Sequence, residues 1–155
     1  MGAAIGSLMD ETDALLFGRR TWDGMAAAWP ERAGDPFADR MNAIRKYVVS
    51  RTLSADDASR WNNSTLLAGD DAIGAIRDLR DSGNDTIQVW GSTALARQLV
   101  ENDLVDEYRL MVEPILLGGG KSIFPGDGRA RTLELVDVQQ AATGTLVCTY
   151  RPVAS

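Results

Sequence analysis

Apolar residues recur along this chain at two spacings, and each spacing predicts a different element. In the first two-thirds, short apolar runs alternate with segments whose apolar residues recur every three or four positions. The runs are typical of buried strands, and the longer spacing is typical of helices that bury one face. The predicted strands cover residues 14–17, 47–49, 65–68 and 86–90. The predicted helices cover residues 1–12, 19–29, a short segment from Pro36, a segment between Asp70 or Asp71 and Gly83, and a segment that follows Thr93.

The helix predicted over residues 19–29 has the clearest pattern. Its apolar side chains stand at positions i, i+3, i+4 and i+7, so they share one face, and Pro30 follows as a stop signal. We therefore expect Trp22 and Trp29 to pack into the core rather than to hold a cofactor.

The last third of the chain has a different character. Residues 108–112, 133–138 and 146–150 predict strands, and the loops between them are rich in glycine and have no helical pattern. Strands that alternate with helices form parallel sheets, whereas consecutive strands pair antiparallel. The sequence therefore predicts a single α/β domain over residues 1–155, with a mostly parallel sheet, flanking helices and an antiparallel C-terminal edge.

Composition excludes several kinds of chemistry. The sequence has 155 residues, no histidine and one cysteine. Histidine-based triads, histidine-ligated zinc and histidine acid–base catalysis are therefore excluded, as are an internal disulfide and an iron–sulfur cluster. We expect no metal site, and we expect Cys148 to be a small buried hydrophobic residue. Any enzymatic activity then takes its reactivity from a cofactor.

Net charge and hydropathy limit the kinds of partner that the protein is expected to bind. The net charge of -6 disfavours binding to nucleic acid or to an anionic membrane. No apolar stretch is long enough to span a bilayer, and the first residues lack the basic region of a signal peptide. We therefore expect a cytoplasmic protein with no nucleic-acid partner and no membrane partner.

Three short polar segments follow predicted strands, which is where open α/β sheets bind their ligands. The first is Gly18-Arg19-Arg20-Thr21, in which two arginines open a helix beside a glycine and a hydroxyl. Arginines are unfavourable at the positive end of a helix unless an anion is present, so this segment is a candidate phosphate site. The alternative is a solvated turn with two exposed arginines.

The second segment is Ser50-Arg51-Thr52, at the end of the second predicted strand. Hydroxyls that flank an arginine suit a phosphomonoester, such as the 2′-phosphate that distinguishes NADP from NAD. An ordinary turn is the alternative. The interpretation as a phosphate site is favoured by the fact that this segment repeats the position and the chemistry of the first.

The third segment is Gly91-Ser92-Thr93, between a predicted strand and a predicted helix. Glycine and small residues at such a junction leave backbone N–H groups free to hold a pyrophosphate. The segment does not match the G-x-G-x-x-G fingerprint of dinucleotide-binding folds. A tight strand-to-helix turn is therefore the alternative.

Together these segments resemble a known family. Residues 13–22 resemble the strand-to-helix segment of dihydrofolate reductases, and the chain is more similar still to the RibD C-terminal domain, the reductase domain of riboflavin biosynthesis. Residues 46–52, 89–92 and 113–120 follow that family's order, and the similarity covers nearly the whole chain. The resemblance implies a dihydrofolate reductase-like fold, with a mixed sheet and flanking helices, that binds NADPH.

The resemblance also implies a role for each segment. In the first segment, Arg19, Arg20 and Thr21, after Gly18, are implied to contact the cofactor phosphates. In the second, Ser50 and Arg51, followed by Thr52, are implied to contact the adenosine 2′-phosphate. In the third, Gly91, Ser92 and Thr93 are implied to contact the pyrophosphate. The implied activity is that of an NADPH-dependent reductase that transfers a hydride to a C=N or C=O carbon of a pterin-, pyrimidine- or sugar-derived small molecule. The implied assembly is a homodimer.

The catalytic residues are not identified by the sequence. Glu113, before Pro114, is the one carboxylate we consider as an acid at the site, and a solvated position at a strand end is the preferred interpretation. Members of the family usually open with a strand and a Ser-Leu-Asp-Gly-like turn, ahead of the helix where this sequence begins. That strand is expected to be central in the sheet. The alternative function is therefore a non-catalytic nucleotide-binding protein that keeps the fold without turnover.

Overall fold

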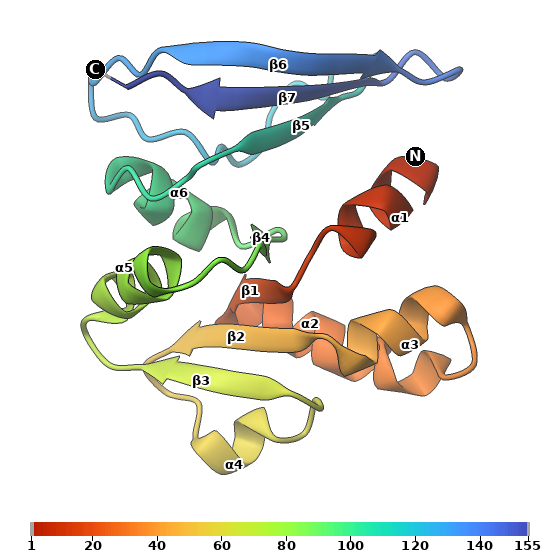
Figure 1. Ribbon diagram of the computed structural model, residues 1–155, viewed down its shortest axis with the longest axis vertical. Helices are drawn as coiled ribbons and strands as arrows, with labels where there is room; N and C mark the ends of the chain where they lie inside the picture. Colours follow the sequence, from red (N-terminus) through yellow and green to blue (C-terminus); the bar gives the residue numbers. More distant parts are fainter. Residues whose placement is uncertain (1, 155) are drawn as a thin grey trace. The chain divides into compact units, whose positions relative to one another are not determined.

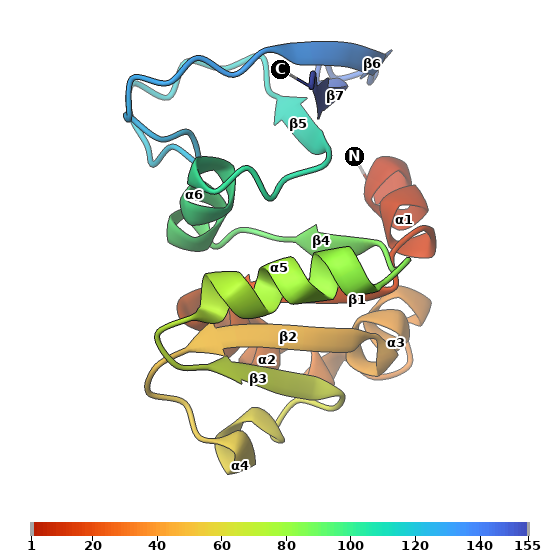
Figure 2. The same cartoon turned by 60° about the vertical axis from the view of Figure 1, so that its left-hand side comes forward.

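The computed structural model describes residues 2–154, so Met1, the first residue of the predicted N-terminal helix, lies outside the described residues. The chain divides into two compact units at the junction of Ala96 and Arg97, and each unit has its own sheet (Figures 1 and 2). The first unit contains α1 (Gly2–Asp10), β1 (Ala14–Gly18), α2 (Arg19–Ala28), a 3-10 helix (Pro30–Arg32), α3 (Pro36–Ala43), β2 (Arg45–Ser50), α4 (Ala55–Ala58), β3 (Ser64–Ala68), α5 (Ala72–Ser82) and β4 (Ile87–Val89). Helix α6 (Thr93–Glu101) crosses the junction, and the second unit contains β5 (Tyr108–Val112), β6 (Leu133–Gln140) and β7 (Leu146–Pro152).

The first unit is built on a four-stranded sheet in which every pairing is parallel. The strand order is β3-β2-β1-β4, and Ala14 of β1 is in register with Arg45 of β2 and with Ile87 of β4. Strand β1 therefore has a neighbour on each side, and its first four residues are buried. This position explains why residues 14–17 form a continuous apolar run without the alternation of a half-exposed strand. The four strands predicted in this part of the chain are confirmed.

The predicted helices are confirmed, and side-chain caps set the start of two of them. Asp35 accepts a hydrogen bond from the Phe37 N–H at 2.8 Å and begins α3. Asp71, and not Asp70, begins α5 by accepting from the Gly74 N–H at 3.0 Å. Helix α4 and the 3-10 helix were not predicted, because elements this short carry no apolar periodicity. No helix within residues 2–154 is long and apolar enough to cross a membrane.

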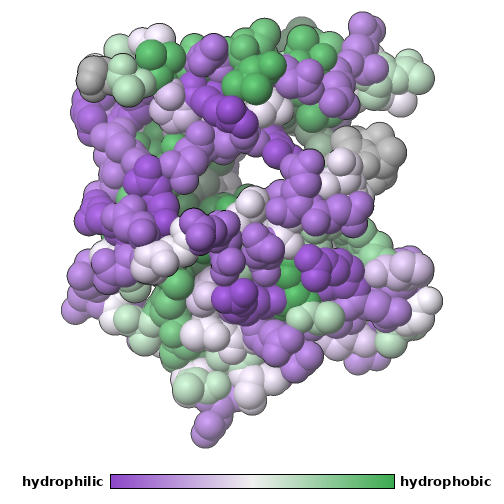
Figure 3. Space-filling view, in the orientation of Figure 1, coloured by the Kyte–Doolittle hydropathy of each residue, from purple (hydrophilic) through white to green (hydrophobic). Residues whose placement is uncertain are grey.

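The second unit is built on a three-stranded antiparallel sheet with the order β5-β7-β6. The mixed α/β class and the three predicted strands are confirmed. The antiparallel strands form a sheet of their own, however, because no ladder within residues 2–154 joins them to the parallel sheet as an edge. Apolar periodicity predicts a strand but does not name its hydrogen-bonding partner. Cys148 is 6% exposed, as expected for a buried hydrophobic residue. Other hydrophobic side chains lie at the surface over β6 and β7, as Figure 3 shows.

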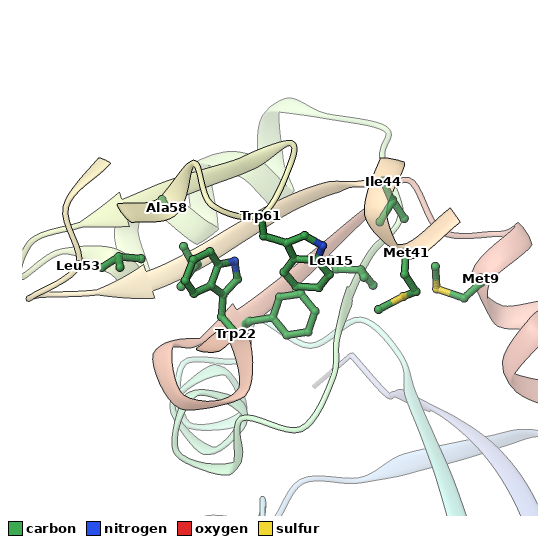
Figure 4. Close-up of a cluster of buried hydrophobic side chains, with 10 residues drawn as sticks. Met9, Leu15, Trp22, Met41, Ile44, Leu53, Ala58 and Trp61 are labelled. Carbon is green, nitrogen blue, oxygen red and sulfur yellow. The ribbon is translucent and has the colours of Figure 1, made fainter. Parts of the chain in front are cut away.

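The core of the first unit is a cluster of aromatic and aliphatic side chains (Figure 4). Trp22 and Trp61 are 0% and 1% exposed, and their ring centroids lie 6.5 Å apart. Phe17 of β1 lies 5.8 Å from the Trp61 ring. Trp29 is half-buried and packs against the same cluster. The prediction that Trp22 and Trp29 belong to the core is confirmed.

One charged side chain lies inside this core. Lys46 on β2 is fully buried, and its Nζ lies 4.5 Å from the centroid of the Trp61 ring. The Nζ donates hydrogen bonds to three backbone carbonyl oxygens, those of Asn42 at 3.0 Å, Ile44 at 2.7 Å and Asn62 at 2.8 Å. Lys46 therefore ties the end of α3 to the segment that leads into β3. Burial lowers the pKa of Lys46 to about 8.

Replacement of Lys46 is expected to change the pH dependence of stability. In the unfolded chain the lysine titrates near pH 10.4. Between about pH 8 and that value the unfolded state therefore binds more protons than the folded state, and the free energy of unfolding rises with pH. Lys46→Met removes this rise, about 2 kcal/mol between pH 7 and pH 10. Urea unfolding of both proteins at the two pH values measures the difference.

The second lysine of the sequence, Lys121, supplies the control. It is exposed in a loop of the second unit. Lys121→Met is expected to keep the pH dependence of the unsubstituted protein. Equal slopes for the unsubstituted protein and Lys46→Met would show that the buried ammonium does not titrate in this range.

Candidate functional site

The three polar segments singled out in the sequence follow β1, β2 and β4, which are adjacent in the parallel sheet. The carboxyl ends of parallel strands lie at the same edge of their sheet. The structure therefore brings the three segments to one edge of the first unit, which we call the carboxyl edge. It is formed by residues 18–21, 50–52 and 91–93.

Two of these segments are hydrogen-bonded to each other. The Gly18 N–H donates to the Ser92 Oγ at 2.8 Å, and the Ser92 N–H donates to the Thr21 Oγ1 at 3.1 Å. The Ser92 hydroxyl in turn donates to the Trp90 carbonyl oxygen at 3.2 Å. The hydroxyls of Ser92 and Thr21 thus join the start of α2 to the start of α6. The Ser92 hydroxyl accepts one hydrogen bond and donates its proton to another within the protein, so it holds the loop in place. A ligand at this segment would therefore contact backbone groups.

The loop before α6 has a backbone shape that few residues adopt. Gly91 and Ser92 both have φ of +56°. A Cβ on Gly91 would also lie 3.2 Å from the Thr21 Cγ2 and 3.3 Å from the Thr21 Oγ1. Glycine is therefore needed at position 91 both for its left-handed backbone and for the close approach to Thr21. Thr93 begins α6 directly after this turn.

Helix α2 begins at the carboxyl edge with its N–H groups uncapped. Gly18 precedes the helix in an extended conformation, no side chain caps the helix, and its first turn has no acidic residue. The first N–H groups of a helix have no partner inside the helix, and they lie at the positive end of its dipole. Arg19 and Arg20 add two positive charges to this turn. An anion would satisfy both the free N–H groups and the excess positive charge.

The two arginines at the start of α2 have different surroundings. The Arg19 Nε forms an ion pair with the Asp23 Oδ2 at 2.8 Å. Arg60 pairs with the other Asp23 oxygen, and its guanidinium lies 4.7 Å from the centroid of the Trp22 ring. The Arg20 side chain is exposed and has no hydrogen bond or ion pair with any other of residues 2–154. Arg20 is therefore the arginine of this turn with its donors free.

Arg60 is a residue that the sequence analysis missed. It belongs to the connection between β2 and β3, and only the fold brings it to Asp23 on α2. No motif surrounds it, so the sequence offers no signal for it.

The segment after β2 is a self-capped turn. Ser50 is 7% exposed, and its Oγ accepts from the N–H groups of Thr52 at 3.1 Å and Leu53 at 3.0 Å. Arg51 and Thr52 are exposed. The side chains of Arg51 and Asp70 are 78% and 98% exposed, and their ion pair is loose, with Nε and Oδ1 3.7 Å apart. Ser50 therefore shapes the turn, and Arg51 presents the charge.

Glu113, the carboxylate considered as an acid, belongs to the second unit. It is exposed, and its Oε2 accepts a hydrogen bond of 2.7 Å from the Oγ1 of the buried Thr145. This contact ties the end of β5 to the turn before β7. It fits the interpretation of Glu113 as a residue at a strand end.

The carboxyl edge is suited to bind an anion with several phosphate groups. It offers uncapped helix N–H groups, a glycine turn that permits close approach, and arginines with free donors. Residues 18–21 and 91–93 are also joined by hydrogen bonds, so the edge is largely preformed. The donor set fits phosphate oxygens, which accept several hydrogen bonds at once.

Comparison with known proteins identifies a family. The family model described as the RibD C-terminal domain matches residues 1–147. The uncharacterized protein YyaP of Bacillus subtilis (strain 168) is 25% identical over 147 residues, which cover 92% of this chain and 75% of that protein.

Solved structures share the fold. A putative riboflavin biosynthesis protein from Shewanella sp. PV-4 superposes with a TM-score of 0.74 at 22% identity, covering 96% of this chain and 78% of that one. A pyrimidine reductase-like protein from Corynebacterium diphtheriae gives a TM-score of 0.62 at 14% identity, covering 93% and 77%. RibD of Acinetobacter baumannii gives 0.68 at 14% identity, covering 99% of this chain and 51% of that protein. This chain thus spans about half the length of that RibD.

Removal of the Ser92 hydroxyl is expected to loosen the carboxyl edge. Ser92→Ala leaves the Gly18 N–H without its acceptor, and we expect the free energy of unfolding to fall by about 1–2 kcal/mol. Chemical denaturation measures the change. Ser82→Ala, at an exposed serine on α5, is the control and is expected to change stability by less than about 0.5 kcal/mol. Equal stability of the two variants would contradict a structural role for the hydroxyl.

Proposed function

This chain belongs to the RibD C-terminal domain family, and on that premise we propose that it is an NADPH-dependent reductase. Its substrate would be a small pterin-, pyrimidine- or sugar-derived molecule with a C=N or C=O carbon that accepts a hydride. The observation that carries this proposal is the carboxyl edge of the first unit. There the uncapped start of α2, the exposed Arg20 and Arg51, and the glycine turn before α6 meet at neighbouring strand ends.

We assign the parts of the cofactor by charge and by free donors. Arg20 and the N–H groups of the first turn of α2 would bind the phosphates that NADPH and NADH share. Backbone groups of Gly91, Ser92 and Thr93 would hold the pyrophosphate at the start of α6. In this assignment the Ser92 and Thr21 hydroxyls keep the two loops in place.

Arg51 would bind the 2′-phosphate that NADPH has and NADH lacks. Its weak ion pair with Asp70 leaves its guanidinium accessible, and Thr52 beside it is exposed. Ser50 would keep the turn in shape through its two backbone contacts. Arg19 would add positive charge while remaining paired with Asp23.

The bound nicotinamide supplies the hydride. The contribution of the chain is to fix the cofactor through its phosphates, so that the nicotinamide is held for a substrate and water is excluded from the reacting carbon. Reduction of a C=N or C=O bond also takes one proton at the nitrogen or oxygen, and solvent that reaches that atom would supply it. None of the residues assigned at the carboxyl edge then needs to act as an acid or a base. The chemistry is therefore compatible with a sequence that has no histidine.

Arg51→Ala is expected to weaken binding of NADPH by about tenfold or more, because a charge-assisted contact to a phosphate is lost. Binding of NADH should be nearly unchanged, since NADH lacks the 2′-phosphate. Calorimetric titration with each nucleotide measures both affinities. Arg77→Ala, at an exposed arginine on α5, is the control and should bind both nucleotides as the unsubstituted protein does. A parallel loss for the two nucleotides would contradict the assignment of Arg51.

Arg20→Ala is expected to weaken NADPH and NADH equally, by about tenfold. The equal loss follows because Arg20 is assigned to phosphates that both nucleotides carry. The same titrations measure both affinities. A loss of affinity restricted to NADPH would instead assign the 2′-phosphate to Arg20.

The titrations also separate the reductase from the alternative function. Tight NADPH binding with consumption of NADPH by a screened C=N or C=O compound supports the reductase. Tight binding without turnover of any such compound favours a nucleotide-binding protein without activity. Absence of binding to either nucleotide would overturn both.

A further inference from the structure

A half-buried tryptophan lies next to the glycine turn of the carboxyl edge. Trp90 directly follows β4 and precedes Gly91. Its carbonyl oxygen accepts the hydrogen bond of 3.2 Å from the Ser92 hydroxyl, so its backbone is part of this turn. Its side chain packs against the core of the first unit, but the residue is only partly buried. Trp90 therefore lies at the border between the core and the candidate site.

The indole N–H of Trp90 is used within the protein. It donates to the Gln88 Oε1 at 2.8 Å, and the Gln88 Nε2 donates in turn to the Leu8 carbonyl oxygen at 3.2 Å. Gln88 lies on β4 and Leu8 lies on α1, so these hydrogen bonds tie the indole to two elements. The direction of the indole is therefore fixed, and its contribution to a ligand would come from the face of the ring.

Phe37 of α3 supports the Trp90 ring. The two rings are stacked, with centroids 6.5 Å apart and an interplanar angle of 21°. Trp29 packs against Phe37 in turn, with centroids 5.5 Å apart. These three half-buried residues form a row of rings that ends at Trp90, beside the glycine turn.

Trp90 differs from the other three tryptophans in its contacts with cations. Each of the other three has a cationic side chain over its ring. The pairs are Arg60 over Trp22 at 4.7 Å, Arg32 over Trp29 at 5.1 Å and Lys46 over Trp61 at 4.5 Å. Within residues 2–154, no arginine or lysine lies over the Trp90 ring in this way. The face of an indole attracts a cation, so Trp90 can offer this attraction to a ligand.

The strand order gives the direction in which the cofactor lies across the carboxyl edge. The strands follow the order β2-β1-β4. The proposed function, on which this step rests, assigns the adenosine 2′-phosphate to Arg51 after β2 and the pyrophosphate to the turn after β4. The nicotinamide is attached on the other side of the pyrophosphate from the adenosine. It is therefore expected on the β4 side of the edge, away from Arg51, where Trp90 lies.

Hydride transfer changes the charge of the nicotinamide ring. In NADPH the ring is a neutral dihydropyridine. The hydride leaves its carbon 4 with two electrons, so the ring becomes a pyridinium cation. The accepting carbon gains the hydride, and one proton from solvent completes the reduction at nitrogen or oxygen. A group that attracts the cation more than the neutral ring therefore favours the transfer, because part of this charge is already present in the transition state.

We propose that the Trp90 indole packs on the nicotinamide ring and stabilises the positive charge that the ring gains as the hydride leaves. Because the attraction is for the cation, Trp90 strengthens binding of NADP⁺ more than binding of NADPH. Gln88 is then a positioning residue, which holds the indole through its N–H. The inference rests on the proposed function and adds a residue that the phosphate assignments do not include.

Calorimetric titration with three nucleotides tests the proposal. NADP⁺ has a charged nicotinamide ring, NADPH has a neutral one, and adenosine 2′,5′-bisphosphate has the 2′-phosphate without any nicotinamide. Trp90→Leu is expected to weaken binding of NADP⁺ by about tenfold and binding of NADPH by about threefold. Binding of the bisphosphate should change by less than about twofold, which would also show that the variant folds with an intact phosphate site.

Two further variants serve as controls. Trp90→Phe keeps an aromatic face and is expected to retain most of the affinity for NADP⁺. Phe124→Leu removes an aromatic side chain of the second unit that is 50% exposed, and it should bind all three nucleotides as the unsubstituted protein does.

Difference absorption spectroscopy gives a second measurement. An indole stacked on a pyridinium ring has a charge-transfer absorption, because the indole is electron-rich and the pyridinium is electron-poor. This absorption is expected when NADP⁺ is added to the unsubstituted protein, and it should be lost in Trp90→Leu.

The titrations distinguish failure of this inference from failure of the proposed function. An equal loss of affinity for all three nucleotides in Trp90→Leu, or unchanged binding of NADP⁺, would overturn the role of Trp90 and leave the proposed function in place. Absence of binding of every nucleotide to the unsubstituted protein would overturn the proposed function and this inference with it.

Discussion

The burial of β1 between two parallel neighbours is the constraint on which the first unit depends. Because both pairings of β1 are parallel, β2 and β4 run in the same direction as β1, and all three strands end at one edge. The chain turns there into α2 after Gly18 and into α6 after Ser92. Strand pairing alone thus brings two helix N-termini and three polar segments together. The hydrogen bonds between Gly18, Thr21 and Ser92 then fix what the sheet has already placed.

The arginines at this edge differ in how readily an anion can engage them. Asp23 has two arginine partners, Arg19 and Arg60, and Arg60 also lies over the Trp22 ring, so this cluster is mutually supported. The pair of Arg51 with Asp70 is long and almost wholly exposed, and such pairs contribute little to stability. A phosphomonoester carries more charge than a carboxylate and can bind a guanidinium through two parallel hydrogen bonds. Among the arginines that form ion pairs at this edge, Arg51 is therefore the one that a phosphate can bind with the smallest loss of existing interactions.

Sequence reasoning succeeded where an element carries its own signal. The continuous apolar run of residues 14–17 identified a buried strand, and a helix was predicted between Asp70 or Asp71 and Gly83, which the structure begins after Asp71. It located the three polar segments because they follow strands. Sequence reasoning did not predict the hydrogen bond from Gly18 to the Ser92 hydroxyl or the ion pair between Arg60 and Asp23, since these contacts join residues far apart in the chain. The separate antiparallel sheet was missed for the same reason, because the choice of partner strands is tertiary.

The antiparallel sheet shows the same limit at the level of a single residue. Strand β6 was predicted from its apolar content, but its alternation is broken by one extra residue between Leu135 and Asp137. In a regular strand Asp137 would lie on the same face as Leu135, two residues before it. The bulge instead pairs Asp137 with Thr149 and places Val138 opposite Cys148. Apolar periodicity alone therefore assigns the residues after the bulge to the wrong face of the strand.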